Sequence, residues 1–197
     1  MVAQPESHIQ PSLYTPLPAE VVSVDKLTAM ENLYRLRFSS GEPLGHRPGQ
    51  FVQVALLGVG ECPISICSSP TRPDTFELCI RRVGEVTEQI HGLEKGSIIG
   101  VRGPLGNGFD VRELHGQDIL IVAGGLGLAP VRSLIHYILD RRDEFGEFHL
   151  LYGCRSPDEL LFKNDLTLWR EDPKVNFHVT VDRPDEQWRG NSGVVTT

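Results

Sequence analysis

The feature that most constrains the fold is residues 118–141, where an apolar run, a glycine-rich turn and an amphipathic segment follow one another. DILIVA (118–123) is continuously apolar, which is typical of a strand covered on both faces of a sheet. After GGLGLAP (124–130), apolar residues recur at helical spacing, with Pro130 near the first turn. This order predicts a strand, a tight turn and a helix.

Two further strands are expected downstream. EFHLLYG (147–153) reads as a strand, residues 157–170 as a helix, and VNFHVTV (175–181) as a third strand. Alternating strands and helices predict a parallel sheet with right-handed crossovers over residues 111–197. Doubly wound nucleotide domains usually have five or six strands, so this unit, with about three, is expected to be incomplete.

The preceding part of the chain has a different pattern. Short β-like segments, separated by Gly, Pro, Asn and charged residues, predict an antiparallel barrel or sandwich over residues 19–110, without a helix of useful length. The segments are AEVVSV (19–24), LYRLRF (33–38), QFVQVAL (50–56), PISICS (63–68), TFELCIRR (75–82) and SIIGVR (97–102). Residues 1–18 are expected to form an N-terminal extension.

Composition excludes several functional classes. A net charge of −7 without a Lys/Arg cluster argues against a nucleic-acid partner. No apolar run approaches the roughly 20 residues that span a bilayer, and the first twenty residues lack a signal peptide's apolar core, so we expect a cytoplasmic protein with no direct membrane insertion. Cys62 and Cys67 have the C-x4-C spacing of plant-type iron-sulfur sites, but the C-x2-C continuation is missing, so buried thiols are favoured over a cluster. The seven histidines are scattered, and no metal site is predicted.

The turn itself has the parts of a dinucleotide loop. Gly124, Gly125 and Gly127 permit a close backbone approach, and the following helix aims unpaired N–H groups at an anion. Pro130 stands where the usual fingerprint has its third glycine. From the residues alone, a nucleotide loop is favoured and a plain βα turn remains the alternative.

Several motifs in the same order resemble the ferredoxin-NADP reductase superfamily. GGLGLAP resembles its G-G-x-G-x-A-P loop, and four upstream segments resemble its flavin barrel: RPGQFVQV (47–54), PISICSSP (63–70), IRRVGEVT (80–87) and VRGPLGNGF (101–109). The resemblance implies a Greek-key FAD-binding barrel followed by an NAD(P)-binding α/β domain. It is strongest to the flavoprotein subunits of cytoplasmic NiFe hydrogenases and sulfhydrogenases, with the dihydroorotate dehydrogenase electron-transfer subunit as a relative.

The resemblance also implies the site residues. The flavin motif falls on Pro63, Ile64, Ser65 and Ile66, with Ser65, the catalytic candidate, near flavin N5. The flavin pyrophosphate is assigned to Ile80, Arg81, Arg82, Gly84, Val86 and Thr87. NAD(P) is assigned to Gly124, Gly125, Gly127, Leu128, Ala129 and Pro130, and its adenosine part to Gly153, Cys154 and Arg155.

Two positions depart from the family pattern. Cys62 replaces the motif arginine and Ile64 replaces the stacking tyrosine. Arg81 or Arg82 could supply the missing charge; the alternative is that one is solvated and the other forms a surface ion pair. The missing motif arginine leaves both FAD and FMN as candidates, and Arg155 alone does not decide between NAD and NADP.

The function implied is electron transfer between NAD(P)H and the iron-sulfur centres of partner subunits in a redox complex. A [2Fe-2S] cluster is expected in this chain only if a segment beyond Thr197 exists. The alternatives are a non-catalytic or FAD-only structural subunit, a subunit of a dihydroorotate or sulfite-reducing enzyme, and a general reductase.

Overall fold

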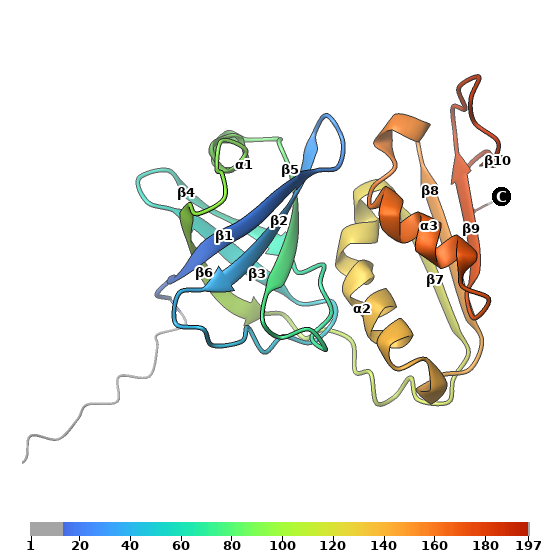
Figure 1. The fold of residues 1–197 in the computed structure, drawn as a ribbon, viewed down its shortest axis with the longest axis horizontal. Coiled ribbons are helices and arrows are strands. Elements are labelled where there is room, and N and C mark those ends of the chain that lie inside the picture. Colours follow the sequence, from blue (N-terminus) through green and yellow to red (C-terminus); the bar gives the residue numbers. More distant parts are fainter. Residues whose placement is uncertain (1–13, 197) are drawn as a thin grey trace, which may run out of the picture.

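The computed structural model describes residues 14–196, which form two sheets joined side by side (Figure 1). The first sheet contains β1 (Leu17–Lys26), β2 (Glu31–Phe38), β3 (Phe51–Leu56), β4 (Gly60–Ser65), β5 (Phe76–Arg81) and β6 (Ile98–Leu105). The second contains β7 (Ile119–Gly124), β8 (Phe148–Cys154), β9 (Asn176–Val181) and β10 (Asn191–Ser192). This confirms the predicted fold class: an antiparallel β unit precedes a parallel α/β unit.

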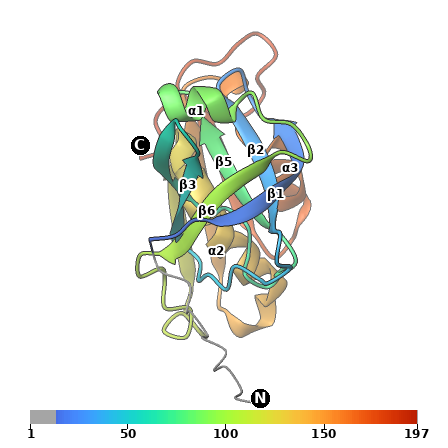
Figure 2. The ribbon, with the colours of Figure 1, turned by 90° about the vertical axis from the view of Figure 1, so that its left-hand side faces the viewer.

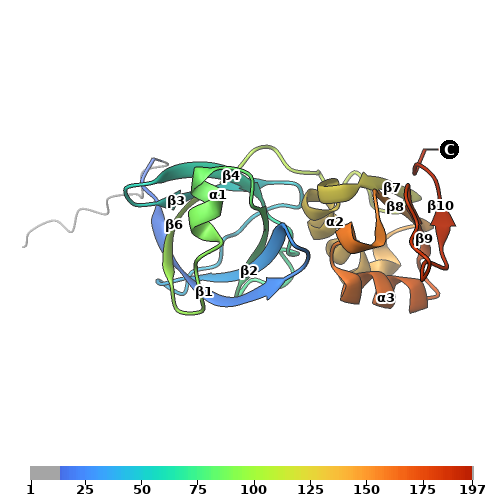
Figure 3. The ribbon, with the colours of Figure 1, turned by 90° about the horizontal axis from the view of Figure 1, so that it is seen from above.

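The first sheet closes into a barrel. Its strands pair antiparallel in the order β4-β3-β6-β1-β2-β5, and a bridge between Ile66 and Leu78 joins the two outer strands. Alternate side chains, among them Val52 and Val54 of β3, point inward and form a closed apolar core. A view along the barrel shows the ring of strands with α1 at its mouth (Figure 3).

Helix α1 (Glu85–Ile90) was not expected from the sequence, which showed no helical period in this part of the chain. Six residues are too few to display one, and the helix instead depends on local capping. The Thr87 hydroxyl accepts hydrogen bonds from the Val83 and Gly84 amides, each at 3.0 Å. Ile90 reaches the barrel core, so α1 closes the upper end of the barrel (Figure 2).

The second sheet is parallel in the order β10-β9-β8-β7, with helices α2 (Leu128–Asp140) and α3 (Lys163–Glu171) packed on one face. β10 adds a short fourth strand to the three expected. The prediction that β7 is covered on both faces was wrong: Leu120 and Val122 are 63% and 47% exposed, because no helix of residues 14–196 packs on their side.

The helix expected over residues 157–170 is divided in two. A 3-10 turn (Pro157–Glu159) is followed by extended residues, and α3 starts only after Phe162, whose φ is +51°. Leu160 has an extended backbone and Phe162 a left-handed one, so the chain leaves the 3-10 turn before α3 begins, and Leu160, Leu161 and Phe162 are all buried there.

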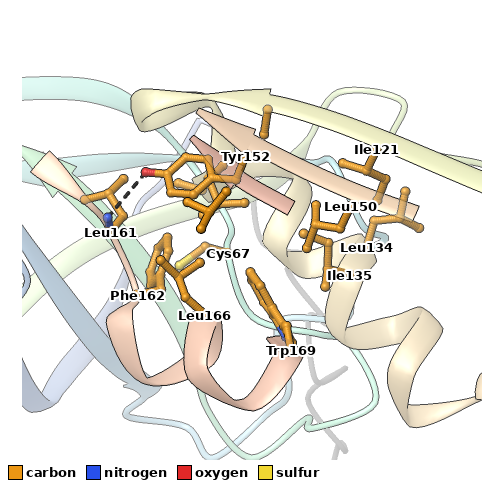
Figure 4. Close-up of a cluster of buried hydrophobic side chains, with 14 of the residues drawn as sticks. Cys67, Ile121, Leu134, Ile135, Leu150, Tyr152, Leu161, Phe162, Leu166 and Trp169 are labelled. Atoms are coloured by element: carbon orange, nitrogen blue, oxygen red, sulfur yellow. Dashed lines mark hydrogen bonds between the residues drawn. The ribbon is translucent and has the colours of Figure 1, made fainter. Parts of the chain in front are cut away.

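The apolar core of the α/β unit extends into the barrel. Leu33, Cys67 and Cys79 belong to the barrel sheet or its loops, yet they are buried in the same cluster as Tyr152 and Trp169. Figure 4 shows Cys67 between Tyr152, Phe162 and Leu166, with the Tyr152 hydroxyl accepting a hydrogen bond from the Leu161 amide at 3.3 Å. The two units therefore meet through a packed interior.

Candidate functional site

The predicted flavin strand lies along a seam in the barrel. An isolated bridge joins Ile66, just after β4, to Leu78 of β5, and α1 packs against β4. We call the surface where β4, β5 and α1 adjoin the seam. Ile66 is fully buried in the barrel core, whereas Ile64 and Cys62 are half-buried and pack against its edge. Pro63 is exposed. The seam thus offers apolar side chains at the surface on which a planar ring could lie.

Ser65 ends β4 and is half-buried. Its hydroxyl makes no hydrogen bond within residues 14–196, so both its donor and its acceptor capacity are available to a ligand. That state is compatible with the expected role near a flavin, and the assignment stays a prediction.

The residues at the end of β5, all expected at the flavin pyrophosphate, differ in burial and in ion pairing. Ile80 is fully buried, so only its backbone could reach a ligand. Arg81 forms an ion pair with Glu31, a carboxylate only 3% exposed, and its charge is therefore already neutralised. Arg82 lies 3.8 Å from Glu88 with both side chains largely exposed, a weak pairing. Of the two arginines, Arg82 has the charge more available to a phosphate.

The turn from β5 to α1 offers backbone donors. Gly84 caps the helix, and Val86 lies beside Gly60 of β4, so the start of α1 borders the seam. The amides of the first turn have no intrahelical acceptor and can donate to a ligand, although Glu85 and Glu88 place two carboxylates in the same turn. The Thr87 hydroxyl also donates to the Gly84 carbonyl at 2.9 Å, so it serves the cap first. An apolar seam beside N–H donors fits a flavin nucleotide.

The glycine loop lies at the carboxyl end of β7. Gly124 ends the strand, residues 125–127 form a 3-10 turn, and α2 begins at Leu128. Gly125 has a φ of +50°, the left-handed region that favours glycine. A Cβ added to Gly124, Gly125 or Gly127 would meet no atom within 4 Å, so the loop borders open space.

The start of α2 explains the unusual end of the loop. Leu128 and Ala129 are buried and anchor the helix, while Pro130 lies in the first turn, where its fixed φ suits a helix. The loop therefore combines an open glycine surface with an uncapped helix start, which fits a pyrophosphate.

The end of β8 lies beside the loop, since Gly153 pairs with Gly124. A Cβ on Gly153 would lie 2.8 Å from Val195, so glycine is required here for packing. The Cys154 thiol donates to the Ser156 carbonyl at 3.0 Å, and burial raises its pKa to about 11. Arg155 is exposed and forms no ion pair within residues 14–196. Arg155 is therefore the charged side chain available at this edge.

Three further properties of the described residues concern their cysteines, metal-binding groups and helix lengths. The four cysteines are free thiols, and residues 14–196 contain no group of three or more His, Cys, Asp or Glu side chains that could hold a metal ion. None of the helices in that part of the chain is long and apolar enough to cross a membrane.

One buried cluster was missed from the sequence. Arg132 of α2 forms ion pairs with Glu77 of β5 at 2.7 Å and Asp165 of α3 at 2.6 Å. Its signal was an arginine between apolar positions of an amphipathic helix, where a side chain facing solvent is the simpler reading.

Comparison with known proteins gives two family matches. Residues 18–109 match an oxidoreductase FAD-binding domain, and residues 121–197 match an oxidoreductase NAD-binding domain. Among curated proteins, sulfhydrogenase 1 subunit gamma of Pyrococcus furiosus is 43% identical over 180 residues, covering 88% of this chain and 61% of the relative. Sulfhydrogenase 2 subunit gamma of the same organism is 42% identical over 170 residues, covering 84% and 58%.

A probable dihydroorotate dehydrogenase B (NAD(+)) electron transfer subunit of Methanothermobacter thermautotrophicus is 42% identical over 120 residues, covering 61% of this chain and 42% of the relative. The chain thus spans about three fifths or less of the length of these relatives.

Solved structures agree on the fold. The ferredoxin reductase of carbazole 1,9a-dioxygenase superposes with a TM-score of 0.77 at 23% identity, covering 92% of this chain and 55% of that one. The cytochrome b5 reductase domain of Ulva prolifera nitrate reductase gives 0.75 at 23% identity, covering 92% and 79%. With an FAD-binding match on the barrel and an NAD-binding match on the parallel sheet, the chain belongs to the ferredoxin-NADP reductase-like family of FAD- and NAD-binding oxidoreductases.

Proposed function

We propose that this chain is the flavin- and nucleotide-binding part of an electron-transfer subunit that moves electrons between NAD(P)H and the iron-sulfur centres of a multi-subunit oxidoreductase such as a NiFe hydrogenase. The supporting observation is that an apolar barrel seam and an open glycine loop occur in one chain that is 42–43% identical to sulfhydrogenase gamma subunits. Residues 19–110 form the FAD unit in this proposal, and residues 111–197 the NAD(P) unit.

The chain's own residues supply binding and orientation. Ile64 and Cys62 would supply apolar contact to the ring system, and the hydroxyl of Ser65 would be available to orient it. Arg82 and the first-turn amides of α1 would hold the pyrophosphate. Gly125 and Gly127 let the second nucleotide approach the backbone, and Arg155 meets its adenosine part.

A bound FAD would supply hydride acceptance from the nicotinamide and one-electron release to acceptors. No acid–base pair of the protein is required for that exchange, and we assign none. The electron acceptors in this proposal are partner subunits, in a complex that we place in the cytoplasm.

The test is direct. The full-length protein should purify with FAD, identified after extraction, and anaerobic NADH or NADPH should bleach the visible absorbance of the oxidised flavin. Co-purifying subunits with iron-sulfur centres should then be reduced. A preparation with FAD that neither NADH nor NADPH bleaches would contradict the proposal.

A second function is favoured by one observation. Cys62 and Ile64 lack the charge and the aromatic ring of the family motif, and Arg81 is already paired with Glu31. These features fit an FAD-only or structural subunit, in which the α/β unit serves for docking. Failure of either nicotinamide to bleach the flavin, with intact assembly of the complex, would favour this function. Identification of the co-purifying subunits separates hydrogenase from dihydroorotate or sulfite-reducing complexes.

A further inference from the structure

The helix that follows the glycine loop is bonded to the segment that follows the flavin strand. We name residues 67–72, which begin two residues after the end of β4 at Ser65, the junction segment. Arg132 donates a hydrogen bond to the Cys67 carbonyl at 3.0 Å, and the Ser133 hydroxyl donates to the Ser68 carbonyl at 2.6 Å. Further along α2, Asp140 accepts from Arg72 at 2.8 Å. One face of α2 therefore holds the junction segment at several points.

Arg132 is the centre of this contact. Its side chain is only 7% exposed and its guanidinium lies 4.5 Å from the centre of the Phe162 ring. Nη1 donates to Glu77 of the barrel at 2.7 Å, and Nε donates to Asp165 of α3 at 2.6 Å. One buried cation thus joins two carboxylates from different units.

Charge interactions hold Arg132, Glu77 and Asp165 in one arrangement. Burial alone would raise the pKa of Glu77, but the guanidinium groups of Arg132 and Arg35 outweigh it and hold the pKa below its ordinary value. The pKa of Asp165 is lowered in the same way: hydrogen bonds and charge from His136 and Arg132 outweigh its burial. All three groups are therefore charged at neutral pH, and each has a fixed partner.

Such a cluster is not needed for stability alone. Apolar residues of similar volume often replace a buried ion pair without loss, because desolvation offsets most of the attraction. What the planar, forked guanidinium adds is direction: each N–H fixes one partner at one angle. The contact is therefore suited to setting the relative position of two units.

The position of Arg132 in the chain connects it to both candidate cofactor sites. It lies five residues after Gly127, about 7–8 Å along the axis of α2 at 1.5 Å per residue. Cys67, whose carbonyl it binds, lies two residues after Ser65. A shift of α2 against the junction segment would move the glycine loop relative to the flavin strand.

We propose that Arg132 is a positioning residue that sets the distance between the nucleotide loop and the flavin strand through Glu77 and the Cys67 carbonyl. The inference rests on the proposed electron-transfer function. Hydride transfer requires the reacting atoms to lie about 3–3.5 Å apart, and a displacement of about 1 Å can cost about 100-fold in rate. Arg132 thus influences the rate while acting at a distance from the reacting atoms.

The test compares Arg132 with a matched residue of the same cluster. Arg35 binds the same carboxylate, Glu77, at 2.7 Å, but both residues belong to the barrel, so this bond does not cross between the units. Arg132→Lys keeps the buried charge and loses the fork, and Arg35→Lys makes the same change within the barrel. Glu77→Gln removes the charge of the shared partner without changing its shape.

The measurement is anaerobic stopped-flow reduction of the FAD-loaded full-length protein by NADH, over a range of NADH concentrations, with 4-deuterated NADH in parallel. For Arg132→Lys and Glu77→Gln we expect the limiting reduction rate to fall at least about tenfold and the deuterium isotope effect to rise, with FAD content and the apparent Kd for NADH unchanged within about twofold. Arg35→Lys should stay within about twofold of the wild-type rate.

Each other result is decisive. Unchanged limiting rates in Arg132→Lys and Glu77→Gln overturn the positioning role and leave the proposed function intact. A slow rate explained by lost FAD or by weaker NADH binding also overturns it, because the role would then be structural. If NADH does not reduce the wild-type flavin at all, the proposed function fails first and this inference fails with it.

Discussion

Replacing Gly127 by alanine separates the stability of the glycine loop from its binding role. Gly127 has a right-handed backbone, with φ −61° and ψ −13°, and an added Cβ would meet no atom within 4 Å. Alanine fits this conformation and reduces the freedom of the unfolded chain, which stabilises proteins by about 0.4–1 kcal/mol. We therefore expect the melting temperature to stay constant or rise by about 1–4 °C, since 1 kcal/mol corresponds to about 2–4 °C in a protein of this size.

Nucleotide binding should respond in the opposite direction. In a dinucleotide loop the second glycine allows the pyrophosphate to approach the backbone, and Gly127 holds that position after Gly125. A methyl group in the open space above the loop would keep the phosphates away from the first-turn amides. We expect a loss of about 1.4 kcal/mol or more, which is about tenfold or more in Kd.

Two further variants make the comparison complete. Gly125→Ala places alanine at φ +50°, which costs roughly 1–2 kcal/mol of stability whatever the ligand. Gly92→Ala adds a methyl group in ordinary contact at 3.4 Å, away from the loop, and should leave binding unchanged.

The assay is isothermal titration with ADP-ribose, which carries the pyrophosphate but cannot exchange hydride, together with thermal unfolding of each variant. If Gly127→Ala binds ADP-ribose as tightly as the wild type, the glycine loop does not hold the pyrophosphate and the reasoning from its open geometry is refuted.

Three other predictions follow from the described contacts. The pKa values of Glu77 and Asp165 are lowered from 4.5 and 3.8, so the stability that these two carboxylates contribute is present above those values and is lost as the pH falls through and below them. Urea unfolding at pH 3 to 7 should show this decline in the free energy of unfolding. Glu77→Gln should make the decline smaller. Burial raises the pKa of Cys67 to about 12 and that of Cys154 to about 11. Iodoacetamide at pH 8 should therefore label the half-buried Cys62 first. If mass spectrometry of the native protein finds Cys67 modified first, the packing around Cys67 is contradicted. Thr87→Val removes the hydroxyl that accepts hydrogen bonds from two amides at the start of α1. The free energy of unfolding, measured by chemical unfolding, should fall by about 1–2 kcal/mol, and FAD should be released more readily on gel filtration. Thr87→Ser should behave as the wild type.

Much of the fold could be predicted from the sequence because it follows from side-chain periodicity. Inward positions of β3 such as Val52 and Val54 alternate with outward ones, and α2 repeats its apolar residues at helical spacing. The glycine loop was also identified correctly as a strand-to-helix turn, since Gly125 and Pro130 each have a local conformational role.

The parts that were missed depend on contacts between distant residues. α1 is held by a cap on Thr87 and by burial of Ile90, neither of which produces a period over six residues. Alternation in β5 shows that Cys79 and Leu78 face opposite sides, but it cannot show that the side of Cys79 is covered by the α/β unit. The charge pairs of Arg132 are invisible in the sequence for the same reason.

The continuous core between the two units limits how freely they can be recombined. Leu33, Cys67 and Cys79 are interior residues of the α/β cluster although the barrel supplies them. In a chimaera that joins this barrel to the nucleotide unit of a distant relative, these three side chains would pack against an interior of different shape. The resulting cavities would lower the free energy of unfolding by about 24 cal/mol per Å³. Because the two units share this core, we expect them to unfold together, and an exchange between relatives to succeed only if the residues of the shared core are carried with the nucleotide unit that covers them.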